Sequence, residues 1–315
     1  MPLFDTHIVV DWSARSKPSP ARPNRDSIWW AVVRNGSALE PQYLRTRHEA
    51  VESLAVFIAG ELDAGRRVLA GFDFPFGYPA GVAERLTGQA SAATVWNWLM
   101  TRIEDKPDNG NNRFAVAEAM NRRWPGVGPF WGRPPAWRYP QIPVRARDRT
   151  CREGHPPERR IADKRAMEAK TVWQLAYAGS VGSQVLVGLP ALKRLLADPR
   201  IGGCGRVWPF DTGLRAPDTR EAPLVLAEIY PSLLRKEVAA CRGDGEVLDR
   251  AQVRVNAAAF ARLDRRGGLA PLFEGACGLS VDERGLIEQE EAWILGLGHE
   301  DGIRDAARTD CDEQG

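Results

Sequence analysis

Three short apolar runs in this chain each end in an acidic residue, and this pattern constrains the fold more than any other feature. The run that begins at His7 ends at Asp11, a second over 67–72 ends at Asp73, and a third over 223–227 ends at Glu228. Short runs rich in β-branched and aliphatic residues are typical of buried strands. If these strands are neighbours in one sheet, their acids converge at one edge of a rigid scaffold, where functional residues are often placed.

The segments between these runs predict an α/β fold with a mixed sheet flanked by helices. Apolar residues at helical spacing predict a helix over 48–62, and Asn35-Gly36 predicts a hairpin turn before it. The predicted strands lie at 7–11, 27–33, 42–45, 67–72 and 224–229. Further helices are predicted at 79–88, 92–104, 113–121, 163–178, 231–239, 249–265 and 281–296.

The chain is expected to form a single domain over 1–315. Its core would be 1–78 together with 221–298, and the segment at about 79–220 would be a large, mostly helical and irregular insertion. Six prolines between 125 and 143 argue against regular structure there. The acidic tail over 299–315 is expected to fray.

Composition indicates a globular protein, with 43% hydrophobic and 27% charged residues and a net charge of only +2. No apolar run is long enough to span a bilayer, so no membrane association is expected. The N-terminus lacks the pattern of a secretory signal. Five scattered cysteines favour free thiols in a reducing compartment, which predicts a cytoplasmic location. They are Cys151, Cys204, Cys241, Cys277 and Cys311.

Clustered carboxylates repel one another unless a cation neutralises them. Asp11, Asp73 and Glu228 are therefore candidate ligands for Mg²⁺ or Mn²⁺, with Asp249 as the fourth and Asp244 as a second choice for that position. Each acid also has a structural interpretation. Asp73 suits a turn, Glu228 an ion pair with an arginine, and Asp249 a helix cap.

The segment 121–165 holds twelve basic and four acidic residues, a local excess of eight. Its arginines alternate with the aromatic residues Trp124, Phe130, Trp131, Trp137 and Tyr139. Arginine with interleaved aromatics suits phosphate contact and base stacking, and Arg145 and Arg147 are the candidates chosen for it. A solvated basic face, or arginines paired with acids elsewhere, would explain the same composition.

The stretch 179–184 (Gly-Ser-Val-Gly-Ser-Gln) lacks the Gly-Lys-Ser/Thr ending of a nucleotide-binding loop. Its backbone amides, with Ser180, Ser183 and Gln184, are candidates for binding an anion, although Gly179 also suits a helix end. Lys170 is a further phosphate candidate, against the alternative of an exposed helix lysine. Cys151 and His155 have no convincing second pair for a zinc site.

The order of these motifs resembles the ribonuclease H-like fold, and more closely an uncharacterised bacterial family described as ribonuclease H-like nucleases. Asp11-Trp12-Ser13 and the segment 71–77 (Gly-Phe-Asp-Phe-Pro-Phe-Gly) are similar to recurring motifs of that family. The stretches 179–184, 189–190, 227–232 and 249–253 are similar to others. The resemblance covers most of the chain and implies that Asp11, Asp73, Glu228 and Asp249 are catalytic and bind metal. It also brings Ser13 into the substrate site.

Together these features predict a nuclease that hydrolyses phosphodiester bonds of a nucleic acid or nucleotide substrate with Mg²⁺ or Mn²⁺. Two alternatives remain open. One is a non-catalytic binding module linked to molybdopterin cofactor synthesis, because some relatives carry a name of that kind. The other is a phosphotransferase of the actin and sugar-kinase type, which would normally need two related halves.

Overall fold

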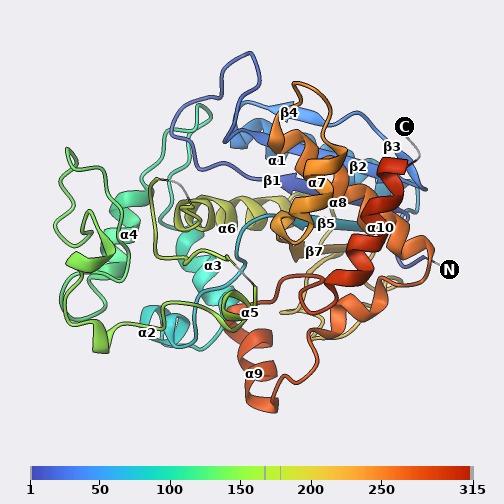
Figure 1. Ribbon diagram of the computed structural model, residues 1–315. Coiled ribbons are helices and arrows are strands. Elements are labelled where there is room, and N and C mark those ends of the chain that lie inside the picture. Colours follow the sequence, from blue (N-terminus) through green and yellow to red (C-terminus); the bar gives the residue numbers. More distant parts are fainter. Residues whose placement is uncertain (1, 167, 178, 313–315) are drawn as a thin grey trace.

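A mixed sheet of seven strands forms the centre of the computed structural model, which describes residues 2–166, 168–177 and 179–312 (Figure 1). The strands are β1 (Thr6–Asp11), β2 (Ile28–Arg34), β3 (Ser37–Ala38), β4 (Gln42–Leu44), β5 (Val68–Phe72), β6 (Gly205–Val207) and β7 (Leu224–Glu228). Their order is β3-β2-β1-β5-β7-β6, and β4 also pairs with β2. β1 runs antiparallel to β2 and parallel to β5, and β5, β7 and β6 are all parallel. The predicted α/β architecture is confirmed.

Helices cover both faces of this sheet. They are α1 (Arg47–Asp63), α2 (Val82–Thr87), α3 (Ala92–Met100), α4 (Arg113–Asn121), α5 (Ile161–Arg165), α6 (Gly182–Leu196), α7 (Arg235–Cys241), α8 (Leu248–Arg265), α9 (Val281–Leu286) and α10 (Glu300–Asp312). Short 3-10 turns occur at 146–148, 152–154, 231–234 and 270–274, and a π-helical turn spans Ile287–Glu291.

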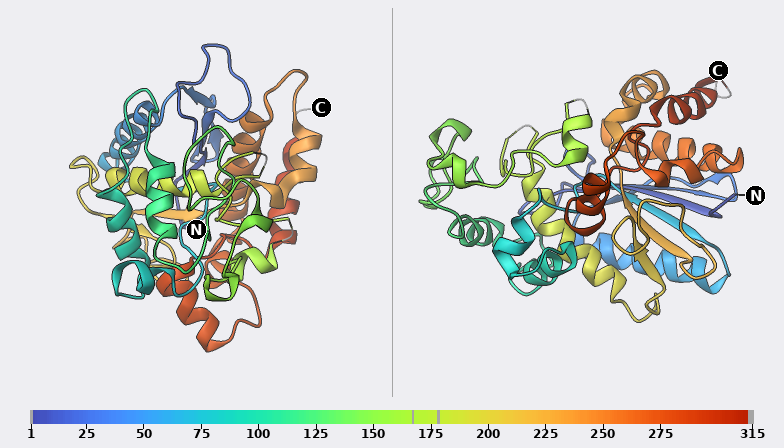
Figure 2. Two further views of the ribbon diagram at one scale, coloured as in Figure 1. Left: turned by 90° about the vertical axis from the view of Figure 1, so that its left-hand side faces the viewer. Right: turned by 90° about the horizontal axis from the view of Figure 1, so that it is seen from below.

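Alternation along the strands divides the buried residues between two cores. Ile8 and Val10 of β1 face one core, which α1, α3 and α6 cover, whereas Val9 faces the other, which α7, α8 and α10 cover. The view from below in Figure 2 shows the strands between these two layers. Side chains alternate between faces along a strand, so odd-numbered positions at the end of β1 point towards α8.

Three sequence predictions are wrong, namely one helix of the insertion, the frayed tail and the end of the last core helix. The predicted helix over 163–178 is only the short α5, and the described part of the chain from 166 to 181 is irregular, with Glu168 and Tyr177 at positive φ. The helix lies later, as α6. The insertion also contributes the edge strand β6, and the tail forms α10 up to Asp312, with 313–315 outside the described residues. The last core helix, predicted to reach 296, ends at 291.

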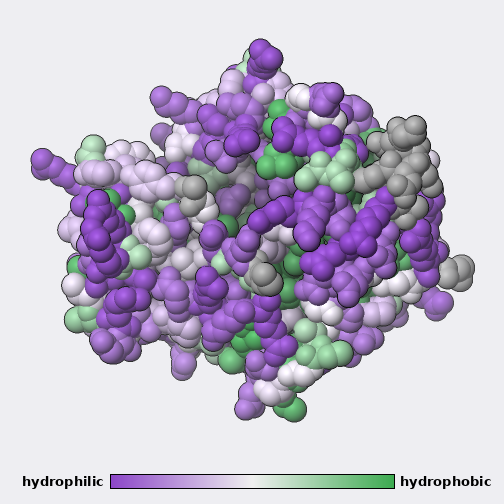
Figure 3. All heavy atoms as spheres, viewed as in Figure 1, coloured by the Kyte–Doolittle hydropathy of each residue, from purple (hydrophilic) through white to green (hydrophobic). Residues whose placement is uncertain are grey.

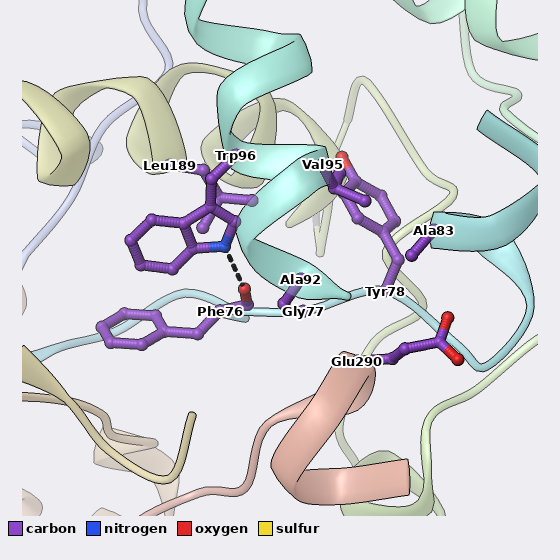
Figure 4. A pocket seen from close by; sticks show the side chains of 9 residues that line it. All are labelled: Phe76, Gly77, Tyr78, Ala83, Ala92, Val95, Trp96, Leu189 and Glu290. Carbon is purple, nitrogen blue, oxygen red and sulfur yellow. Dashed lines mark hydrogen bonds between the residues drawn. The ribbon is translucent and has the colours of Figure 1, made fainter. Parts of the chain in front are cut away.

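Close packing explains the glycine that ends the segment 71–77. A Cβ at Gly77 would lie 2.1 Å from the backbone oxygen of Glu290 in the π-helical turn. Figure 4 shows this region, where the indole nitrogen of Trp96 donates to the Phe76 carbonyl at 2.8 Å. The gap between these side chains has no room for a water molecule. We therefore interpret it as a packing defect of the core.

The helices of the described residues include none that is long and apolar enough to cross a membrane. On the face seen in Figure 3, hydrophilic side chains cover most of the surface.

Cys151, Cys204 and Cys277 are free thiols. Cys241 is disulfide-bonded, so the prediction of free thiols throughout is wrong at this position.

Candidate active site

Asp11 and Asp73 lie side by side where two parallel strands end. Asp11 is the last residue of β1, and Asp73 directly follows β5. Val10 pairs with Phe72 in this ladder, and the Asp73 amide donates to the Val10 carbonyl at 3.2 Å. The next pair in register is therefore Asp11 with Asp73, and both occupy positions on the α8 face of the sheet.

The two carboxyl groups are hydrogen-bonded to each other. Burial raises the pKa of Asp11 well above its usual range, and the negative charges of Asp73 and Asp249 raise it further. Burial also raises the pKa of Asp73 to about 6, although hydrogen bonds from Asp11 and from the Trp12 amide act in the opposite direction. The Trp12 amide donates to Asp73 Oδ1 at 2.7 Å. In the absence of a cation, burial and mutual repulsion therefore favour the protonated form of these groups.

Asp249 supplies a third negative charge from the first turn of α8. Its Oδ2 accepts a hydrogen bond from the Asp26 amide at 2.9 Å, and the Ser27 amide also donates to this carboxylate. Burial raises its pKa. The cap residue of α8 is Val247, which has no side-chain hydrogen bond. Asp249 thus anchors the loop before β2 to α8.

Asp26 is an acidic neighbour that sequence reasoning missed, because it lies in a loop rich in proline and arginine. Its charge raises the pKa of both Asp11 and Asp249. Ser13, a predicted site residue, donates its hydroxyl to the Asp26 carbonyl at 2.6 Å. The antiparallel pairing of β1 and β2 could have indicated its position. Asp11 is opposite Trp29, so the residues directly before β2 must lie near Asp11.

Glu228 is not part of this cluster. Its two oxygens accept from the Arg160 guanidinium at 2.6 and 2.7 Å, and Arg160 also pairs with Asp163. The Phe76 amide donates to Glu228 as well. In register, Glu228 is opposite Phe72 and not Asp73, so it occupies a position of opposite parity to the two aspartates. The arginine-paired interpretation of this residue fits these contacts.

Arg47 fixes the loop that follows Asp11. It forms a buried ion pair with Asp105, with 2.6 Å between Arg47 Nη2 and Asp105 Oδ1. Its Nη1 donates to the carbonyl oxygens of Ser13 at 3.1 Å and of Arg15 at 2.7 Å. The backbone beside the aspartates is therefore held in one conformation.

The first turn of α6 meets the same loop. Gln184 Nε2 donates to the Trp12 carbonyl at 2.6 Å, and Ser183 Oγ donates to the Leu175 carbonyl at 2.5 Å. Arg113 Nε in turn donates to Ser183 Oγ at 2.8 Å. Gln184 and Ser183 thus lie near the aspartates, but their polar atoms already have protein partners.

The remaining predicted contacts are spread over the surface. Ser180 is half-buried, and Lys170 is exposed with its alkyl chain against Gly179. Arg145 and Arg147 are exposed beside the 3-10 turn at 146–148. Among the described residues, neither arginine has a hydrogen bond to an aspartate of the cluster.

The aromatic residues of the segment 121–165 divide into two groups. Trp124 and Phe130 are buried and pack against Trp173, so they belong to the core. Trp137, in contrast, is 43% exposed.

His155 Nε2 lies 3.0 Å from the Pro125 carbonyl, and no zinc site forms around it among the described residues.

Across the described ranges, no group of three or more His, Cys, Asp or Glu side chains is arranged to hold a metal ion. The Asp11–Asp73 pair nevertheless fits a divalent cation. Within the described chain neither carboxylate, nor Asp249, has an ion pair with a basic residue, although the charge of Arg25 lowers the pKa of Asp249. Mg²⁺ commonly uses one or two carboxylates and completes its shell with water and substrate phosphate oxygens. The donor set is therefore sufficient for a site completed by substrate.

Comparison with known proteins gives no match: no family model, no curated protein and no solved structure matches this chain.

Proposed function

We propose that this protein is a metal-dependent nuclease of ribonuclease H-like fold, with its active site at Asp11 and Asp73. The observation that carries the proposal is the hydrogen-bonded pair of carboxyl groups, with Asp249 beside it and no basic residue of the described chain paired to any of the three. The strand order β3-β2-β1-β5-β7, with β2 antiparallel to β1 and the later strands parallel, supports the fold assignment.

Asp11 and Asp73 would hold Mg²⁺ or Mn²⁺, which supplies an activated water and neutralises charge on the phosphodiester. For this, both carboxyl groups must be ionised. The Trp12 amide holds Asp73 in position, and Asp249 increases the negative potential while it anchors the loop that carries Asp26. Arg47 and Gln184 keep the backbone after Asp11 in place.

Asparagine at either position of the pair tests this proposal. Asp11→Asn or Asp73→Asn should lower Mn²⁺-dependent cleavage of single-stranded and duplex oligonucleotides by at least about 100-fold, because the cation loses a charged ligand. The circular dichroism spectrum should stay unchanged. The control is Asp301→Asn, whose side chain is 99% exposed, and which should cleave like the wild type.

Unchanged cleavage in both variants would refute the proposal. Absence of cleavage by the wild type across DNA and RNA substrates with Mg²⁺ and Mn²⁺ would instead favour a non-catalytic binding module.

A further inference from the structure

A half-open pocket of about 390 Å³ lies beside the loop that follows Asp11. Its walls come from Ser16, from the start of α4 with Asn111, Arg113 and Phe114, and from the segment 137–139 (Trp-Arg-Tyr). Ligand pockets commonly enclose about 300–1,000 Å³. This volume therefore suits a small ligand or one nucleotide.

Aromatic rings form one wall of this pocket. Phe114 stacks on Tyr139 with 5.8 Å between ring centroids and 27° between planes. The ring of Trp137 meets Phe114 edge-on at 4.8 Å. Trp137 keeps 43% of its surface exposed, although a tryptophan of the core would be covered. A supported but exposed indole is typical of a surface on which a base stacks.

Arg113 places a positive charge beside these rings. Its Nη1 donates to Ser16 Oγ at 2.7 Å and to Asn111 Oδ1 at 2.8 Å, and its guanidinium lies 5.0 Å from the Phe114 ring centroid. Among the described residues no carboxylate forms an ion pair with it, although the charge of Asp105, which is paired with Arg47, raises its pKa. Burial and the charge of Arg47 lower the pKa of Arg113 to about 10. The guanidinium of Arg113 is half-buried and has only neutral hydrogen-bond partners, so this part of the pocket favours an anionic ligand.

The pocket is connected to the aspartates through α6. Arg113 binds Ser183, and the next residue, Gln184, binds the carbonyl of Trp12, which directly follows Asp11. Ser16 belongs to the same loop as Trp12. A strand with one nucleotide in this pocket would therefore have its backbone beside the loop that leads to Asp11.

From this arrangement we infer that the pocket binds an unpaired base of a single-stranded nucleic acid. The base stacks on Trp137, and Arg113 and Arg138 contact the adjoining phosphates. The inference rests on the proposed function and specifies its substrate class. Duplex nucleic acid does not fit, because a paired base has no free face to offer the indole.

Binding without metal tests the inference separately from catalysis. Fluorescence anisotropy in EDTA would use a labelled ten-nucleotide oligothymidylate, the same oligomer as a duplex, and an abasic oligomer of equal charge. The wild type should bind the single strand more tightly than either other probe. Trp137→Ala should weaken this binding by about 5- to 100-fold, and Trp137→Phe should retain most of it.

Two exposed arginines of the same segment provide a matched pair. Arg138→Ala should reduce the slope of log affinity against log salt by about 0.7, because one phosphate contact is lost. Arg152→Ala, which is exposed and lies outside the pocket, should leave the slope unchanged. Equal effects of both substitutions would indicate a diffuse basic face and overturn the inference. So would equal binding of all three probes, or an unchanged affinity in Trp137→Ala.

The two proposals fail in different ways. If Asp73→Asn cleaves like the wild type while Trp137→Ala loses single-strand affinity, the catalytic proposal is wrong and the pocket stands. If Asp73→Asn loses cleavage while Trp137→Ala binds normally, the pocket is wrong and the catalytic site stands.

Discussion

At the scale of single residues, the aspartate pair is held in a state that is unfavourable without a cation. Asp11 and Asp73 share a hydrogen bond, and burial raises the pKa of both. The two side chains are neighbours because they occupy equivalent positions on adjacent strands. The same register that brings them together makes this site a source of instability at neutral pH.

Stability without metal should therefore depend on this pair. Because its carboxyl groups keep their protons to higher pH in the folded than in the unfolded chain, their contribution to stability falls as pH rises from about 4 through 6. Asp73→Asn keeps a hydrogen-bonding side chain but removes one charge. In EDTA at pH 7 it should be more stable than the wild type by on the order of 1 kcal/mol, with the difference vanishing near pH 4.

Thermal melts of both proteins at several pH values, with EDTA throughout, measure this difference directly. A lower melting temperature for Asp73→Asn than for the wild type at pH 7 would show that the pair is not a repulsive site.

The sequence was sufficient to identify Asp11 and Asp73 as site residues. It was not sufficient to decide which other acids belong to the same cluster. Asp11 and Asp73 were identifiable because an acid that ends an apolar run must lie at a strand end. Glu228 has the same sequence context, yet it pairs in register with Phe72 and faces Arg160. One residue of register decides the face of a side chain, and register depends on long-range pairing that a single sequence does not display.

At the scale of elements, α6 makes two contacts that its sequence does not predict. Its first turn contacts the loop after Asp11, and its middle packs on the aromatic residue after Asp73. Gly182, Gly188 and Pro190 make it a poor helix by intrinsic propensity, so periodicity favoured a helix over 163–178 instead. Tertiary packing overrides that preference: a Cβ at Gly188 would lie 2.5 Å from the Phe74 ring.

Two glycine-to-alanine substitutions distinguish the effect of core packing on stability from the effect of helix propensity. Gly188→Ala should destabilise the protein by about 1–3 kcal/mol, because the added methyl overpacks against Phe74. Gly60→Ala in α1, where nothing lies within 4 Å of the new Cβ, should stabilise it by about 0.5–1 kcal/mol. Urea denaturation measures both. A neutral Gly188→Ala would mean that α6 can move away from the segment 71–77.

At the scale of the whole molecule, the sheet unites the predicted core and insertion. Three insertion elements complete this structure: α3 and α6 cover one face of the sheet, and β6 extends its edge. Figure 1 shows α2, α3 and α4 beside the sheet, towards the left of the view. Sequence boundaries at about 79 and 220 therefore separate segments of different composition that share one hydrophobic core.

Unfolding should accordingly be cooperative. Far-ultraviolet circular dichroism reports the helices of the whole chain. Fluorescence reports buried tryptophans of the insertion, such as Trp96 and Trp173, together with those of the strands, such as Trp30. The two signals should give one coincident transition in urea, since the insertion has no separate core to retain. Two transitions with different midpoints would indicate that the insertion unfolds independently.

The central claim is that Asp11 and Asp73 bind a divalent cation together, and a calorimetric Mn²⁺ titration tests it most directly. The wild type, Asp73→Asn and Asp301→Asn would each be titrated alone and with a hydrolysis-resistant phosphorothioate oligonucleotide. We expect Mn²⁺ binding to the wild type and to Asp301→Asn, strengthened by the oligonucleotide and lost in Asp73→Asn. Binding that persists unchanged in Asp73→Asn, or no binding to the wild type even with the oligonucleotide, would contradict the claim.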